Sequence, residues 1–187
     1  INDWFRAQSY YDSGGWRGTW ELDGGGCLMN QGLTLIDLLL WFVGEAEEVV
    51  AMAETRGRTV EVETLGMGLV RFRNGARGVV EATTLAYPEL PQYLEIFGAR
   101  GTIAFSGDQL QRMDLIDPSP AENTEREALF ARSAELEAEK AKILAAAPPG
   151  TAVPTVDMGH TPVIADFAEA IRSGRKPLVC LLYTSPS

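Results

Sequence analysis

Histidine and cysteine are scarce in this sequence, and their scarcity excludes several kinds of active site. The chain has one histidine, His160, and two cysteines, Cys27 and Cys180. Without His160, no Ser-His-Asp set, Cys-His pair or metal-ligand cluster can be assembled. Two cysteines give neither a disulfide framework nor a zinc-binding spacing. We therefore predict no metal site, and we expect His160 to cap a helix rather than to act as a general base.

The sequence also lacks a long apolar run and a basic cluster. No apolar run approaches the ~20 residues of a membrane span, and no signal peptide is recognisable. The formal net charge is −10, from 16 Lys and Arg against 26 Asp and Glu. This balance argues against a nucleic-acid or anionic membrane surface. We expect a cytoplasmic protein with no nucleic-acid or membrane partner, whose 187 residues bury a single core.

The most informative segment covers residues 16–32, with the sequence WRGTWELDGGGCLMNQG. Three consecutive glycines at positions 24–26 follow a polar loop that contains Trp16, Arg17 and Trp20. Glycines in a row cost backbone entropy, so they indicate positive φ angles or a main chain that passes very close to another group. A flexible turn is the alternative interpretation. The two tryptophans and the arginine favour a loop that faces a ligand.

A helix is predicted over residues 26–43, and Gly44 ends it. Its expected buried stripe, at spacings of three and four, consists of Met29, Leu33, Ile36, Leu40 and Val43. A second stripe places Asn30 and Thr34 one turn apart, in the first half of the helix, where the dipole favours an electron-rich ligand. Hydrogen bonding inside a core would explain the same spacing, so the spacing alone identifies no reaction.

The rest of the chain predicts an α+β fold. Asn74-Gly75 is a strong hairpin signal, and short turns between consecutive strands indicate an antiparallel meander. The expected architecture is an open, predominantly antiparallel β-sheet with helices packed on one face. The apolar open face would be covered by another subunit, which predicts a homo-oligomer. Strands are expected over residues 4–11, 48–55, 62–73, 77–85, 93–97, 102–105 and 109–116, and further helices over residues 121–147 and 155–176.

Several motifs together carry a family resemblance. They include GWRGTW over residues 15–20, DGGG over 23–26 and LMNQG over 28–32, with further matches at residues 10–11, 36–37, 70–72, 74–75, 81–84, 95–98, 101–102, 159–160, 166–167 and 170–171. From residue 1 to about 179 the sequence resembles the C-terminal domain of the Gfo/Idh/MocA oxidoreductases. The variant resembles members that act on nucleotide-linked amino sugars or their uronic acids.

The resemblance implies a division of labour between two domains. Such enzymes bind NAD or NADP in an N-terminal Rossmann domain that also carries a lysine near the nicotinamide, while the C-terminal domain supplies the substrate pocket and the oligomer interface. This sequence has no G-x-G-x-x-G and no such lysine. Residues 1–179 are therefore expected to be a truncated substrate-binding and oligomerisation domain that is inactive alone. Residues 180–187 resemble a translated sequencing adapter and are expected to be non-native.

The resemblance also assigns roles to individual residues. Trp16 and Arg17 match the pair that reaches the cofactor, and Asn30 and Thr34 match the two catalytic helix positions. The predicted substrate-binding residues are Thr19, Trp20, Asn30, Gln31 and Tyr87. The second catalytic position is commonly histidine, and a threonine hydroxyl can relay a hydrogen bond but is not a base near neutral pH.

Three explanations of Thr34 remain open: the absent lysine moves the proton, the parent enzyme is weakened, or the codon is a sequence error. Three functions remain open as well. The leading one is the substrate domain of an NAD(P)-dependent oxidoreductase that transfers hydride between a sugar and nicotinamide. The alternatives are an NAD-dependent glycoside hydrolase of the same architecture and a non-catalytic binding or oligomerisation module. The sequence names neither the sugar nor the choice between NAD and NADP.

Overall fold

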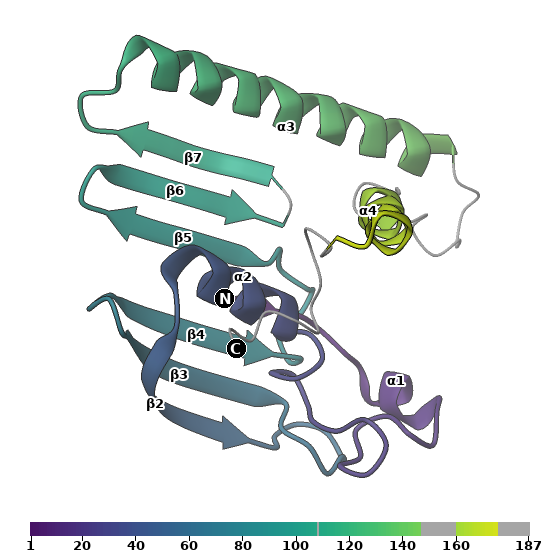
Figure 1. The fold of residues 1–187 in the computed structure, drawn as a ribbon. Coiled ribbons are helices and arrows are strands. Elements are labelled where there is room, and N and C mark those ends of the chain that lie inside the picture. The colour runs from purple at the N-terminus through teal and green to yellow at the C-terminus, as the bar shows by residue number, and fades with distance from the viewer. Residues whose placement is uncertain (108, 147–159, 176–187) are drawn as a thin grey trace. The chain divides into compact units, whose positions relative to one another are not determined.

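The computed structural model describes residues 1–107, 109–146 and 160–175 (Figure 1). The chain divides into two compact units, Ile1–Ser133 and Ala134–Ser187. The first unit contains all of the described strands and the candidate site. The expected tail at residues 180–187 lies outside the described residues.

A four-stranded sheet occupies the centre of the first unit. Its strand order is β1-β4-β3-β2, and only the short β1 pairs in parallel, with β4. The hairpin predicted at Asn74-Gly75 is confirmed: Gly75 has a φ of 90°, and its N–H donates to the Phe72 carbonyl over 3.0 Å. The strands are β1 (Asn2–Asp3), β2 (Ala46–Glu54), β3 (Leu65–Phe72) and β4 (Arg77–Thr83).

The later strands form a second, three-stranded sheet, in the order β5-β6-β7. They are β5 (Tyr93–Gly98), β6 (Gly101–Ser106) and β7 (Gln109–Leu115), and all pairs are antiparallel. The sequence predicted one continuous meander, and the structure corrects this to two sheets. The connection between β4 and β5 contains Pro88 and Pro91, whose missing N–H groups cannot extend a strand ladder.

The two sheets are nevertheless linked through Ile1. The Ile1 nitrogen donates to the Tyr93 carbonyl, and the Tyr93 N–H donates to the Ile1 carbonyl, each over 2.8 Å. Helix α2 (Leu33–Val43) adds a second link, because Phe42 near its end stacks on Phe105 of β6 with ring centroids 6.3 Å apart. The predicted fold class, α+β with open and mainly antiparallel sheets, is confirmed.

The strand predicted over residues 4–11 is wrong for most of its length. The chain makes one bridge from Phe5 to Leu85 and then forms helix α1 (Gln8–Asp12). The Gln8 side chain joins this helix to the loop before β3, since its Oε1 accepts the Thr59 N–H at 2.8 Å. The helical turn buries Tyr11, whose hydroxyl lies 3.0 Å from Oγ1 of Thr84. These tertiary contacts override the extended pattern of the sequence.

Helix α2 packs against one face of the four-stranded sheet, but it starts at Leu33 rather than at residue 26. Its buried side is also displaced from the predicted stripe. Leu35 is 8% exposed, whereas Leu33 is 48% and Leu40 is 38% exposed. The helix is apolar on nearly every side, so its periodicity did not identify the face that packs on the sheet.

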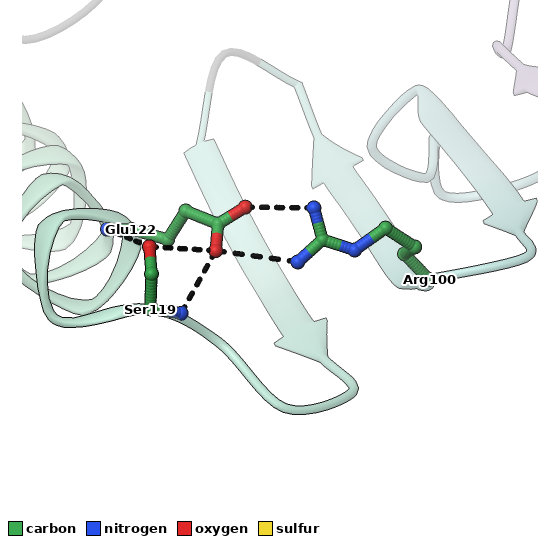
Figure 2. Close-up of polar contacts among 3 residues, drawn as sticks. All are labelled: Arg100, Ser119 and Glu122. Atoms are coloured by element: carbon green, nitrogen blue, oxygen red, sulfur yellow. Dashed lines mark hydrogen bonds and ion pairs between the residues drawn. The ribbon is translucent and has the colours of Figure 1, made fainter.

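Helix α3 (Pro120–Ala146) begins with a capping box that also receives an ion pair from the β5–β6 turn (Figure 2). The Ser119 N–H donates to Oε2 of Glu122 at 2.8 Å, and the Glu122 N–H donates to Oγ of Ser119 at 3.3 Å. The Arg100 guanidinium adds a bidentate contact at 3.0 and 3.2 Å. Arg100 and these Ser119 donors lower the pKa of Glu122 to about 2.

Helix α4 (His160–Ser173) lies in the second unit. Both long C-terminal helices were predicted from the sequence, and the structure confirms them within the described residues. The predicted ends at residues 147, 155–159 and 176 lie outside that part. Among the helices in the described part of the chain, none combines the length and the apolar character needed to cross a bilayer.

Candidate functional site

The three glycines of the loop at residues 16–32 meet the conditions that the sequence predicted. Gly24 has a φ of 80°. A Cβ built on Gly26 would lie 1.8 Å from the Glu63 carbonyl oxygen, so no other residue fits there. The close neighbour is a residue of the same chain, and Gly25 and Gly26 are buried. These glycines therefore seat the loop on the protein and do not themselves face a ligand.

The segment immediately before β3 supports this loop at two points. The Glu63 carboxylate accepts the N–H groups of Gly26 at 2.9 Å and of Leu28 at 3.0 Å. Two residues earlier, the Glu61 carboxylate accepts the Trp20 N–H at 3.0 Å, and the Glu61 N–H donates to the Gly18 carbonyl at 2.9 Å. The sequence analysis missed both glutamates. Their alternation in the run Val60-Glu61-Val62-Glu63 is the signal that could have pointed to them.

Asp23 connects the tryptophan-arginine part of the loop to Asn30. Its Oδ2 accepts the Gly18 N–H at 2.8 Å, and its Oδ1 lies 3.4 Å from Nδ2 of Asn30. A carboxylate can only accept hydrogen bonds, so the Asn30 amide turns its NH₂ group toward Asp23. The carbonyl oxygen of the same exposed amide then remains available as an acceptor. Asp23 was in the motif that carried the family resemblance, but its role as an anchor was not predicted.

The predicted placement of Asn30 and Thr34 on one helix face is wrong. Asn30 lies in a turn before α2, where its N–H donates to the Gly26 carbonyl at 2.9 Å. Thr34 lies in the first turn of α2 and is exposed. The two residues therefore flank the start of the helix at Leu33, and both face solvent.

Trp16 and Arg17 form a stacked pair with Tyr10. The Arg17 guanidinium carbon lies 4.5 Å from the Trp16 ring centroid and 4.6 Å from that of Tyr10. Arg6 approaches the Tyr10 ring as well, at 5.3 Å, so two guanidinium groups share one aromatic ring. Among the described residues, Nε of Arg17 is buried without a hydrogen-bond partner. Arg6 is ion-paired with Glu89 at 2.9 Å, so Arg17 is the group of this cluster whose positive charge is suited to an anionic ligand.

The remaining predicted binding residues differ in how accessible they are. Thr19 holds the loop itself, since its hydroxyl donates to the Trp16 carbonyl at 2.7 Å. Trp20 is 57% exposed, whereas Gln31 is only 8% exposed. Tyr87 lies beyond β4, outside this loop, and packs edge-on against Phe5 with ring centroids 5.2 Å apart. The structure thus brings the residues between 16 and 30 together and leaves Tyr87 on a separate segment.

Cys27 is the reactive group that lies within the loop itself. It is buried, desolvation raises the pKa of its thiol to about 12, and it donates to the Ala82 carbonyl at 3.2 Å. It is therefore a protonated structural residue rather than a nucleophile. His160 is the first residue of α4, and its side chain lies outside the described part. Over the described ranges, no group of three or more His, Cys, Asp and Glu side chains is placed to hold a metal ion.

The site is an exposed wall rather than an enclosed pocket. An apolar cavity of about 290 Å³ lies between α2 and the four-stranded sheet, lined by residues such as Ile36, Leu39 and Val70. Arg17, Asn30 and Thr34 do not line it.

These features define a class: an open-sheet α+β domain that presents a cationic aromatic pair and an oriented asparagine from the loop before its first long helix. The chain belongs to the Gfo/Idh/MocA oxidoreductase family, because the model described as "GFO/IDH/MocA C-terminal domain" matches residues 1–104. A comparison with curated proteins finds no match.

Solved structures agree with this family. The WlbA dehydrogenase from Bordetella pertussis, in complex with NADH and UDP-GlcNAcA, is 30% identical with a TM-score of 0.73, over 94% of this chain and 46% of its own. The WlbA dehydrogenase from Chromobacterium violaceum, with the same ligands, is 32% identical with a TM-score of 0.61, over 95% and 52%. A levoglucosan dehydrogenase with NADH and levoglucosan shares the fold at 24% identity and a TM-score of 0.56, over 86% and 45%. The chain spans about half the length of these proteins.

Proposed function

We propose that residues 1–179 are the substrate-binding and oligomerisation domain of an NAD(P)-dependent oxidoreductase that transfers hydride between a nucleotide-linked sugar and nicotinamide. The observation that carries the proposal is the pair of contacts made by Asp23, which tie the loop carrying Arg17 to the Asn30 amide. The likeness to two dehydrogenases described with NADH and UDP-GlcNAcA supports a uronic acid of an amino sugar as the substrate.

The residues around Arg17 fit a nicotinamide dinucleotide. Guanidinium groups donate to phosphate or carboxamide oxygens in a planar, forked geometry, and Nε of Arg17 has no partner among the residues that the structure describes. Trp16 is 45% exposed and offers a stacking face beside this guanidinium. The bound cofactor would supply the hydride chemistry. Arg17 and Trp16 would hold one part of it, and most of its binding would fall to a separate dinucleotide-binding domain.

Asn30 and Thr34 would bind and orient the reacting sugar hydroxyl. The Asn30 carbonyl oxygen is placed to accept the hydroxyl hydrogen, and the Thr34 hydroxyl can donate or accept. Neither group takes a proton near neutral pH, so the proton acceptor is assigned to the cofactor-binding part of the enzyme, where the family places a lysine. This domain alone would then be inactive.

Thr34 itself favours one other candidate, a non-catalytic binding or oligomerisation module. In such a protein the substrate would still bind at Asn30, but no hydride transfer would follow. Turnover separates the two candidates. When the chain is joined to the nucleotide-binding half of a WlbA dehydrogenase, the oxidoreductase produces NADH in proportion to sugar oxidised. A glycoside hydrolase of this architecture would show no net cofactor reduction, and a binding module would show no reaction.

The exposed face of the four-stranded sheet supports the oligomerisation role. Val50, Leu69 and Val79 stand opposite one another on β2, β3 and β4, and they are 66%, 62% and 66% exposed. Met52 and Met67 extend the same row. An exposed apolar surface of this kind is costly in water and is commonly covered by a partner. We assign that partner as a second copy of the chain.

Substrate binding can be tested on the chain as it stands. UDP-GlcNAcA is titrated into labelled protein while the side-chain amide resonances of Asn30 are followed. Those resonances should move, and Asn30→Ala should weaken binding about tenfold, the cost of one hydrogen bond to a bound ligand. Asn123→Ala on α3 removes the same group away from the site and should bind like the wild type. Equal affinity of the two variants would refute the assignment.

A further inference from the structure

We propose that Glu63 is a positioning residue, whose carboxylate fixes the turn before α2 and so sets the direction of the Asn30 amide. The inference rests on the proposed function, because it assigns Asn30 to the substrate. It concerns a residue outside the motifs of the loop, on the segment that enters β3.

Glu63 receives three consecutive main-chain N–H groups of the loop. Gly26 donates to Oε2 at 2.9 Å, Cys27 donates to the Glu63 carbonyl at 2.9 Å, and Leu28 donates to Oε1 at 3.0 Å. Both carboxylate oxygens are used on different peptide units. A carboxylate that accepts two amides fixes the orientation of the peptide units more strictly than a single neutral hydrogen bond does.

The contact between Gly26 and Glu63 is too close to leave room for a side chain at position 26. A Cβ on Gly26 would come within 1.8 Å of the Glu63 carbonyl oxygen and 2.8 Å of its side-chain carboxyl carbon. The two backbones therefore touch directly. Glu63 thus acts on the loop through both its main chain and its side chain.

Glu63 is itself held rigidly by the sheet. Its neighbour Thr64 is fully buried, and the Thr64 carbonyl accepts both the Thr84 N–H at 3.0 Å and the Thr83 hydroxyl at 2.9 Å. On the other side, the Arg56 N–H donates to Oγ1 of Thr64 at 2.8 Å. Glu63 is therefore fixed by the segment that enters β3, and its contacts set the position of the loop.

The peptide units of Gly26 and Cys27 connect Glu63 to the candidate site. The Gly26 carbonyl accepts the Asn30 N–H at 2.9 Å, and the Cys27 carbonyl accepts the Gly32 N–H at 2.7 Å. Gly26 and Cys27 thus donate their N–H groups to Glu63. Their carbonyls accept the N–H groups of Asn30 and of Gly32, the residue before α2. A change in the Glu63 carboxylate should reach the main chain of Asn30 through two hydrogen bonds, and the side-chain amide should move with that main chain.

Glu61 supplies a matched comparison within the same segment. Within the described part of the chain, its carboxylate accepts one main-chain N–H, from Trp20. A glutamine at position 61 keeps an acceptor for that donor. A glutamine at position 63 keeps one acceptor but turns its NH₂ group toward the second amide, which places two donors against each other. Glu63→Gln should therefore disturb the loop, and Glu61→Gln should not.

The test measures three quantities in the full chain and in both variants: amide hydrogen exchange, thermal unfolding, and affinity for UDP-GlcNAcA. In Glu63→Gln we expect about tenfold faster exchange at Gly26, Leu28 and Asn30, with strand β3 unchanged, and about tenfold weaker binding of the probe. Glu61→Gln should stay within about twofold of the wild type in both. A purely structural role would lower the unfolding temperature without separating the loop from β3.

The outcomes separate this inference from the proposed function. If the wild type binds UDP-GlcNAcA and Glu63→Gln binds it equally well, the positioning role is overturned. If the wild type does not bind the probe, the proposed function fails, and exchange at Asn30 decides the role of Glu63 alone. Glu63→Asp keeps the charge on a shorter side chain and replaces Glu63→Gln if that variant does not fold. It should give the same pattern, and unchanged exchange at Asn30 would overturn the inference.

Discussion

Replacing Gly26 by alanine is the sharpest perturbation that the structure offers. The new Cβ would lie 1.8 Å from the Glu63 carbonyl oxygen, whereas real Cβ contacts essentially never fall below 3.0 Å. The two backbones must therefore separate by more than about 1 Å, which stretches hydrogen bonds of 2.9–3.0 Å beyond a useful length. The substitution acts on one point of contact and adds only a methyl group.

The expected cost follows from the interactions that would be lost. One neutral hydrogen bond and two to a carboxylate connect Glu63 with residues 26–28. Neutral bonds contribute roughly 1 kcal/mol and charge-assisted ones roughly 1.5–3 kcal/mol, less where water replaces the partner. The lower end of these values adds up to about 4 kcal/mol. Because Glu63 is only partly buried and water can replace part of its contacts, we expect a smaller cost, about 3 kcal/mol. For a chain of this size that corresponds to a fall in Tm of roughly 6–12 °C.

Urea and thermal unfolding measure this cost, with Gly15→Ala as the control. Gly15 lies in the same loop region, is exposed, and has nothing within 4 Å of a built Cβ. Its substitution should leave the free energy of unfolding within about 0.5 kcal/mol of the wild type. If Gly26→Ala proved as stable as Gly15→Ala, the close contact with Glu63 would not exist in solution, and the support assigned to the loop would be wrong.

Three further predictions concern other parts of the molecule. Because the folded-state pKa of Glu122 is about 2, below its ordinary value of 4.5, its contacts stabilise the fold above about pH 4.5; the difference in unfolding free energy between wild type and Glu122→Gln should vanish as the pH falls through about 2. Leu69→Glu should convert the oligomer to a monomer, as measured by sedimentation velocity, while Ile116→Glu, equally exposed but outside the four-stranded sheet, should not. A monomeric wild type would refute the proposal that a second copy covers the exposed sheet face. In the chain joined to a WlbA nucleotide-binding half, Thr34→His should raise turnover by about 10²-fold or more if the missing base limits the rate, and an unchanged rate would assign the proton to another group.

The strands were predictable because their boundaries depend on local chemistry. The Gly75 N–H donates to the Phe72 carbonyl, so Arg73 and Asn74 are the central residues of the turn, and Gly75 follows with a φ of 90°. Strands β3 and β4 pair on either side of this turn. The break between the two sheets was not predicted, although Pro88 and Pro91 mark it in the sequence. Alternation of apolar residues shows that strands exist, but it does not show that consecutive strands share one ladder.

The sequence predicted which segment forms the candidate site but not the contacts that shape it. The loop at residues 16–32 was identified because three glycines and an aromatic-arginine pair are unusual neighbours. The structure joins Asp23 by hydrogen bonds to Asn30 and to Gly18, which follows Arg17 in the chain. The anchors Glu61 and Glu63 are separated in sequence by 41 and 35 residues from Trp20 and Leu28, whose N–H groups they accept. No sequence pattern predicts which distant side chain will accept a given main-chain N–H.

The predicted start of α2 at residue 26 was wrong, and the contacts of Glu63 explain why the helix begins at Leu33 instead. The turn at residues 26–32 contains a helix-like bond, from the Asn30 N–H to the carbonyl four residues earlier, so the apolar period runs through it without interruption. The next bond, from Gly32 to Cys27, spans five residues, and the regular helix begins only afterwards. The N–H groups of residues 26–28 would be unpaired in either arrangement, because the first turn of a helix has no internal acceptors. Glu63 provides acceptors for all three, and this favours a turn seated on the strand segment over one more turn of helix.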